Sequence, residues 1–185
     1  MLGDPRDTAI RLRHIEDRQE IADKLHLYCR ALDRVDENLL RSVFHPESQH
    51  SHGSFQGLSA DFVGFAMQVI TGLDRTHHML GNVVIELEAD RAFSEAYFIA
   101  YHRIGKDRPP FGPFITHRPG VDEDIIISGR YLDRWERRDG VWKIARRIGV
   151  HDWEQWRDAD ERDLPTLPSS GRGRRDHLDP VYLRT

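Results

Sequence analysis

The sequence contains very little cysteine. Its 185 residues include only Cys29, so the chain cannot form an intrachain disulfide or build a metal site from several cysteines. No apolar run approaches the ~20 residues that a membrane-spanning helix needs. The chain does not begin with basic residues followed by an apolar segment, so we see no signal peptide. These absences predict a soluble, cytoplasmic protein.

An excess of charge of either sign is also lacking. The 27 lysines and arginines and 31 aspartates and glutamates are mixed along the chain and give a net charge of −4. Such a mixture offers neither a basic patch for nucleic acid nor a face for an anionic membrane. A phosphate loop, a dinucleotide fingerprint and a nucleophile elbow are absent as well. We therefore expect no nucleic-acid partner and no membrane partner.

The apolar content is sufficient for one folded core. Hydrophobic residues make up 38% of the chain and aromatic residues 9%. We predict a single domain over residues 14–156, preceded by a loose polar N-terminal arm at residues 1–13. Residues 157–185 form a polar C-terminal tail without helix or strand periodicity. We expect that tail to be disordered, or to wrap another subunit or a pocket mouth.

A helix is predicted from Asp17, because Asp17 and Glu20 resemble a capping box. Apolar residues then recur at helical steps: Ile21, Leu25, Tyr28 and Leu32. Asp33 continues this face close to the C-terminal end, where the helix dipole disfavours a negative charge. Such local conflicts concentrate at functional sites. The alternative interpretation is that Asp33 and Asp36 begin a solvated turn.

Two shorter helices are predicted, over residues 37–44 and from the N-cap Ser59 to Leu73, with a hairpin near Gly53-Ser54 between them. Three histidines lie in the polar segment before Ser59: His45, His50 and His52. His50 and His52 would share one strand face and could bind a metal. No third ligand has suitable spacing, so we favour surface or pocket-rim histidines and predict no metal site.

The segment Thr76-His77-His78-Met79-Leu80-Gly81-Asn82 begins a strand that runs to Glu88. Neighbouring residues on a strand point to opposite faces, so either His77 or His78 faces inward. A buried imidazole without a partner costs on the order of 1–3 kcal/mol. The best partner that the sequence offers is Asp33, far upstream.

Three more strands are predicted, over residues 92–104, 125–138 and 141–150, with turns at Asp90 and at Asp139-Gly140. The long proline-rich loop at residues 106–124 is expected to rim a pocket. Helices followed by antiparallel strands, with one helix inserted, indicate an α+β protein. We predict a cone-shaped half-barrel in which the N-terminal helices pack on a strongly curved, mostly antiparallel sheet and enclose a small-molecule pocket.

Aromatic residues on the predicted strands suggest a hydrophobic ring compound as the ligand. The aromatic residues expected to line the pocket are Tyr97, Phe98, Tyr101, Trp135 and Trp142.

Four segments together resemble the SnoaL-like branch of the nuclear transport factor 2-like superfamily, whose fold is cystatin-like. They are the helix ending in Tyr28 and Asp33, the strand start Thr76-x-His78-x-x-x-Asn82, the strand Gly129-Arg130-Tyr131-x-Asp133 and the hairpin Arg138-Asp139-Gly140-Val141-Trp142-Lys143-Ile144. The resemblance covers residues 15–156. Members include scytalone dehydratase, hexachlorocyclohexane dehydrochlorinase and bile acid 7α-dehydratase, in which an Asp–His dyad performs an elimination without metal or organic cofactor.

The resemblance implies roles for five residues of this chain. Asp33 and His78 would form the dyad, and Tyr28 would donate to a departing oxygen or a developing enolate. Arg147 would hold a carbonyl or carboxylate, with a structural ion pair as the alternative. His102 matches a strand position that carries a second histidine or another polar group. The implied activity is that of a cofactor-independent lyase or isomerase, dehydratase- or cyclase-like, in a homo-oligomer (dimer or trimer).

Two alternatives of the same fold stay open at this point. One is a non-catalytic small-molecule-binding protein, and the other is a structural subunit of an oligomer, because a fold does not fix a function.

The resemblance and strand parity disagree about which histidine faces inward. Strict alternation groups His77 with Val83, Ile85 and Leu87, whereas the family pattern selects His78. Both can hold only if a bulge near Gly81 shifts the register, and a glycine in a strand often marks one. We predict that bulge and an inward His78.

Overall fold

The computed structural model describes residues 5–109, 118–160 and 172–183. The helices are α1 Pro5–Asp33, α2 Glu37–Ser42, α3 Ser59–Thr71 and the short α4 Pro180–Leu183. The strands are β1 Phe44–His52, β2 Phe55–Leu58, β3 Arg75–Glu88, β4 Arg91–Ile104, β5 Glu123–Arg138 and β6 Val141–Asp158. No helix of these described parts is long and apolar enough to cross a membrane.

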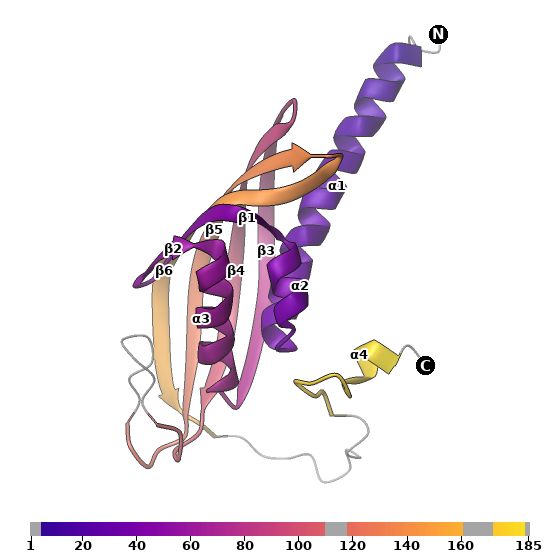
Figure 1. The fold of residues 1–185 in the computed structure, drawn as a ribbon. Coiled ribbons are helices and arrows are strands. Elements are labelled where there is room, and N and C mark those ends of the chain that lie inside the picture. Colours follow the sequence, from indigo (N-terminus) through magenta and orange to yellow (C-terminus); the bar gives the residue numbers. More distant parts are fainter. Residues whose placement is uncertain (1–4, 110–117, 161–171, 184–185) are drawn as a thin grey trace.

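The strands form one six-stranded sheet in the order β2-β1-β6-β5-β4-β3. The pairing of β1 with β6 is parallel, whereas the other neighbouring strands are antiparallel. Figure 1 shows the sheet strongly curved, with α1, α2 and α3 on one side of it. The predicted α+β half-barrel, with its meander of the last four long strands, is confirmed.

The turns follow from residues that tolerate a positive φ. Asp139 and Gly140 have φ values of 51° and 79°, which suits the tight turn that joins two twisted antiparallel strands. Gly53, at φ 57°, reverses the chain between β1 and β2. Both predicted hairpins are therefore present. Ser59 also starts α3 as expected, but as its first helical residue: the N-cap is Leu58, which makes no side-chain cap bond.

The sequence prediction placed the start of the first helix too late in the chain. Residues 5–13 were expected as a loose arm, but α1 begins at Pro5, and proline is well suited to the first helical turn. The exposed side chains from residue 7 to residue 16 make no apolar stripe, so periodicity cannot detect this part. Asp17 does not cap the helix. It is buried inside α1, where its carboxylate accepts hydrogen bonds from Trp142 Nε1 at 2.8 Å and from Arg137 at 2.6 Å.

The C-terminal part of the chain is more regular than its composition indicated. β6 continues to Asp158 instead of ending at residue 150, because residues 151–158 pair with β5. Beyond residues 161–171, which lie outside the described part, the chain packs against the ends of the helices. Arg175 donates to the carbonyl oxygens of Ile70 and Leu73 at 2.8 and 2.5 Å, and Tyr182 donates to Asp36 at 3.2 Å.

The core contains a fully buried ion pair. Arg147 of β6 makes two hydrogen bonds of 2.7 Å to Asp133 of β5, and both side chains are 0% exposed. The guanidinium carbon lies 3.9 Å from the ring centroid of Tyr28 and 4.4 Å from that of Tyr131. Burial lowers the pKa of Arg147, but the charge and hydrogen bonds of Asp133 outweigh burial and raise it above its usual value. Burial raises the pKa of Asp133, and the charge and hydrogen bonds of Arg147 oppose that shift. The two short bonds have the geometry of an ion pair, which joins β5, β6 and α1.

Replacing Arg147 by methionine should destabilise the protein by about 3–5 kcal/mol, because Asp133 would be left as an uncompensated buried charge. The double variant Arg147→Met, Asp133→Leu should recover most of that loss. The measurement is urea unfolding followed by circular dichroism. Arg130→Met is the matched control, since Arg130 pairs with Glu95 and Asp152 at the surface and should matter much less. A small effect of Arg147→Met, similar to that of the control, would contradict this assignment.

Candidate active site

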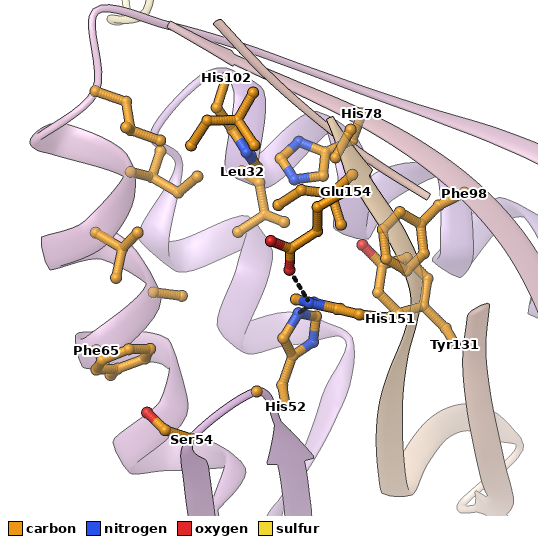
Figure 2. A pocket seen from close by; sticks show the side chains of 18 of the residues that line it. Leu32, His52, Ser54, Phe65, His78, Phe98, His102, Tyr131, His151 and Glu154 are labelled. Atoms are coloured by element: carbon orange, nitrogen blue, oxygen red, sulfur yellow. Dashed lines mark hydrogen bonds and ion pairs between the residues drawn. The ribbon is translucent and has the colours of Figure 1, made fainter. Parts of the chain in front are cut away.

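A cavity of about 820 Å³ lies between α3 and the inner face of the sheet. Its walls are mostly aromatic and aliphatic, with Phe62, Phe65, Val69 and Ile70 contributed by α3. Figure 2 shows several polar side chains among them. The cavity rim includes Arg118, which ion-pairs with the buried Glu123 at 2.7 Å. The described part of the predicted loop thus borders the pocket, as expected.

Asp33 and His78 make a two-point contact. The ring Nδ1 of His78 lies 2.8 Å from Asp33 Oδ1, and the backbone N–H of His78 donates to Asp33 Oδ2 at 2.9 Å. Burial raises the pKa of Asp33, but the hydrogen bonds and charge of His78 outweigh burial and lower it below its ordinary value. Asp33 is therefore an anion that fixes the ring of His78. Because Nδ1 faces the carboxylate, Nε2 is the nitrogen left for a ligand in the cavity, which His78 lines.

The inward position of His78 depends on a bulge in β3. The pairing of β3 with β4 shifts register between Leu80 and Val83, so Gly81 and Asn82 interrupt the alternation. Thr76, His78 and Leu80 therefore face inward before the bulge, and Val83, Ile85 and Leu87 face inward after it. His77 is exposed. The strand thus has the predicted bulge near Gly81, and His78 rather than His77 lines the cavity.

Tyr28 reaches the same cavity from α1, five residues before Asp33. Its side chain is buried, and burial raises the pKa of Tyr28 to about 12 although the charge of Arg147 opposes the shift. The phenol is therefore protonated in the whole physiological range. A buried, protonated phenol can donate a hydrogen bond to an oxygen of a ligand.

Arg147 is not among the residues that line the cavity. Its Nε and Nη2 atoms are bonded to Asp133, and its guanidinium packs on the rings of Tyr28 and Tyr131. Of the two roles that the sequence left open, this geometry matches the structural ion pair. A direct contact with a ligand carbonyl or carboxylate has no support from its position.

His102 of β4 lies next to His78, with the two ring centroids 5.2 Å apart, because His102 pairs with Thr76 in the sheet. Burial and the neighbouring charge of His78 lower the pKa of His102 to about 3. The ring is therefore neutral at ordinary pH. A neutral imidazole has one N–H donor, and His102 lines the cavity.

The sequence did not indicate a second polar cluster in the cavity. His151 and Glu154 of β6 both line it, and so does His52 of β1. His151 Nδ1 lies 3.2 Å from Glu154 Oε1, and His151 Nε2 lies 3.2 Å from His52 Nε2. Because the predicted strand ends at residue 150, His151 and Glu154 fall outside it. The alternation of His50 and His52 on one face was the only usable signal.

His50 and His52 point to the same side of β1, as expected, but they do not form a metal cluster. His50 is buried and its ring stacks on Phe62 at 3.4 Å. Among the described residues, no group of three or more histidine, cysteine, aspartate and glutamate side chains could hold a metal ion.

The predicted aromatic lining is correct for one residue of five. Phe98 lines the cavity and stacks on Tyr131 at 4.4 Å. Tyr97 points to the outer face of the sheet and is 43% exposed. Tyr101, Trp135 and Trp142 are not lining residues. Trp135 and Trp142 are buried in the core, because hydrogen bonds to Ser94 and Asp17 satisfy their ring N–H groups there.

Helices on one side of a strongly curved sheet are the arrangement of the nuclear transport factor 2-like, cystatin-like fold. A family model described as a SnoaL-like domain matches residues 13–148. The chain therefore belongs to the SnoaL-like family. A search of curated proteins by sequence found no match.

Solved structures share the fold at low sequence identity. A hexachlorocyclohexane dehydrochlorinase of type 2 is 19% identical, with a TM-score of 0.70 over 85% of this chain and 99% of that one. A protein provisionally described as a scytalone dehydratase, from Novosphingobium aromaticivorans, is 22% identical, with a TM-score of 0.63 over 80% and 91%. A nuclear transport factor 2-like protein with a cystatin-like fold, from the same species, is 20% identical, with a TM-score of 0.62 over 82% and 92%.

Buried histidines should make the stability of this protein depend on pH. Burial lowers the pKa of His52 and of His102 to about 3, and it lowers that of His50 as well. Below pH ~6.5 the unfolded chain takes up protons that the folded protein does not bind. The free energy of unfolding should therefore fall as the pH decreases from about 6.5 toward 3, by up to about 1.4 kcal/mol per pH unit for each histidine.

Urea unfolding at a series of pH values measures this dependence. His102→Asn should flatten it, whereas His77→Gln at the exposed neighbour of His78 should leave it unchanged. A free energy of unfolding that is constant between pH 6.5 and pH 4.5 would contradict the buried neutral state of these rings.

Proposed function

We propose that the protein is a cofactor-independent lyase or isomerase, dehydratase- or cyclase-like, that acts on a hydrophobic ring-containing small molecule through the Asp33–His78 dyad. The observation that carries the proposal is the two-point contact of Asp33 with His78 beside an apolar cavity of about 820 Å³. A base held by a buried carboxylate, with its second nitrogen left for a ligand in a largely apolar cavity, is suited to removing a proton from carbon.

His78 is the general base of this proposal. A histidine titrates near neutral pH and can accept and return a proton within one turnover. Asp33 holds Nδ1 as the donor, so Nε2 has the lone pair that attacks a C–H bond next to a carbonyl group. After the transfer, the carboxylate stabilises the imidazolium ion, as a buried aspartate does in serine hydrolases.

Tyr28 and His102 are the donors for the negative charge that develops on the carbonyl oxygen. Both are neutral at ordinary pH and each has one hydrogen to donate: burial raises the pKa of Tyr28 to about 12, so the phenol keeps its O–H, and lowers that of His102 to about 3, so the ring is an imidazole with a single N–H. Fixed donors in a water-poor site stabilise an enolate more than water does. Arg147 then acts as a positioning residue, since its guanidinium packs at 3.9 Å on the ring of Tyr28.

The walls of the cavity favour a flat apolar substrate. Phe62 and Phe65 of α3 and the stacked pair of Phe98 and Tyr131 contribute ring faces. Aromatic faces bind another ring through burial of apolar surface and through stacking or edge contacts. The volume of the cavity is within the range of small-molecule sites.

Replacing Asp33 by asparagine should lower turnover by about 10²–10⁴-fold without unfolding the protein, because the amide cannot hold the charged His78. His78→Gln should remove the base and have at least as large an effect. The measurement is exchange of the α-proton of cyclic ketones in deuterium oxide, followed by nuclear magnetic resonance. This assay detects the first proton transfer alone, so it works whichever product the natural substrate forms.

Two matched controls separate the dyad from general damage. His77→Gln changes the exposed neighbour of His78, and Asp61→Asn changes an exposed carboxylate on α3. Both should retain the wild-type exchange rate. An α-proton exchange rate in Asp33→Asn equal to that of the wild type would contradict the catalytic role of the dyad. Ligand binding by the wild type without any exchange would favour the non-catalytic binding protein.

A further inference from the structure

Three residues of the cavity have no role in the dyad chemistry. Glu154, His151 and His52 form a chain of two contacts of 3.2 Å, from the carboxylate to one imidazole and on to the other. All three line the same cavity as His78. Figure 2 shows Glu154 directed to His151, with His52 beyond it, while His78 and His102 lie toward the other end of the cavity. The cavity therefore has polar groups at two separate places.

A bulge in β6 brings two of these residues to one face. Ser128 of β5 pairs with Trp153 and Gly129 pairs with His151, so Asp152 is an extra residue on β6. Residues three apart on a regular strand point to opposite faces, whereas the bulge directs both His151 and Glu154 into the cavity. Asp152 itself is held outside by Arg130, at 3.0 and 3.1 Å.

A glycine makes room for the third residue. His52 of β1 lies opposite Gly149 of β6, and a Cβ at position 149 would stand 2.3 Å from Nδ1 of the His52 ring. Any side chain there would displace the imidazole. His52 can therefore occupy this place only because residue 149 is glycine.

The contact between the two imidazoles requires a proton. Two nitrogen lone pairs repel each other, so the 3.2 Å contact between Nε2 of His151 and Nε2 of His52 forms only when one of them carries a hydrogen. Glu154 accepts from Nδ1 of His151, which leaves Nε2 as the atom through which His151 exchanges a proton. While both rings are neutral, that hydrogen belongs to His52, because Nδ1 carries the single hydrogen of His151. When His151 is an imidazolium ion, which the carboxylate of Glu154 stabilises, its Nε2 holds a transferable proton at the cavity wall.

The groups around this proton come from several elements. Glu154 lies on β6 and Tyr131 on β5, and His78 and His102 line another part of the cavity. The charge of Arg147 also acts on His52 and lowers its pKa.

Two further anions lie nearby, but Asp152 is paired with Arg130 and Glu123 with Arg118. Glu154 is the carboxylate that contacts the imidazole pair. A ligand oxygen in the cavity is the natural acceptor.

We propose that His151, oriented by Glu154 and paired with His52, is the general acid that protonates an oxygen leaving group, so that the substrate is a cyclic β-hydroxy carbonyl compound. This inference rests on the proposed function of the dyad. His151 begins the step as an imidazolium ion whose Nδ1–H is donated to Glu154. His78 takes the α-proton, the C–C double bond forms and the C–O bond breaks. The departing oxygen replaces His52 as the acceptor at Nε2 and takes that proton, which leaves His151 neutral. The products are an unsaturated carbonyl compound and water, and His78 returns its proton to His151 through solvent.

The chemistry of the leaving group gives the reason. Hydroxide is a poor leaving group and departs readily only with a proton, whereas chloride or a stabilised phenolate departs as an anion without an acid. A dyad alone would be enough for a substrate that loses chloride or a phenolate. An acid placed in the cavity apart from the base is needed only for a substrate that loses a hydroxyl group.

The test compares three reactions of wild type and His151→Asn. They are α-proton exchange of β-hydroxycyclohexanone in deuterium oxide, loss of water from the same ketone, and loss of para-nitrophenolate from its para-nitrophenyl ether. His151→Asn should slow the loss of water by about 10²–10⁴-fold. It should leave α-proton exchange and release of para-nitrophenolate within about threefold of wild type, because neither needs the acid.

Glu154→Gln is the second variant, since it keeps the shape of the side chain and acts only through His151. It should slow the loss of water less than His151→Asn does, and again leave the other two reactions unchanged. Glu86→Gln, at an exposed position of β3, is its control.

The acid role of His151 would be contradicted if His151→Asn slowed all three reactions equally or slowed none of them. In both cases the wild type still exchanges the α-proton, so the proposed role of the dyad is unaffected. Failure of the wild type to exchange the α-proton would instead overturn the proposed function, and the acid role with it.

Discussion

The buried ion pair between Arg147 and Asp133 is the interaction on which the other features depend. It joins β5 to β6 at the centre of the sheet, and its guanidinium is the surface on which Tyr28 of α1 packs. A charge pair without water is stable only when its geometry is good and its hydrogen bonds are made. The pair therefore links the two central strands to the first helix through Tyr28, which also lines the cavity.

The candidate active site uses the ends of elements that this centre holds in place. Asp33 is the last residue of α1, and His78 lies near the start of β3. A carboxylate at a helix C-terminus is unfavourable alone, but the backbone and ring N–H groups of His78 compensate it. Local stability is thus given up at the site and recovered by a contact between distant segments.

Departures from regular strand geometry place the polar groups of the cavity. The bulge at Gly81 turns His78 inward, and the bulge at Asp152 turns both His151 and Glu154 inward. Without them, strand alternation would send one residue of each set to solvent. Bulges are common beside active sites, because one extra residue redirects a side chain without disrupting the sheet.

The sequence by itself determined the α+β fold, the hairpins, the Asp33–His78 pair and the bulge at Gly81. The helices, strands, hairpins and bulge have local signals, since periodicity, glycine and turn residues act on neighbouring residues along the chain. The pairing of Asp33 with His78 joins segments that are distant in sequence, and it was predicted from the family resemblance. Tertiary structure alone decided the start of α1, the length of β6 and the cluster of His52, His151 and Glu154. Residues 151–158 form a strand because β5 supplies their hydrogen-bond partners, and no local pattern records a partner that is distant in sequence.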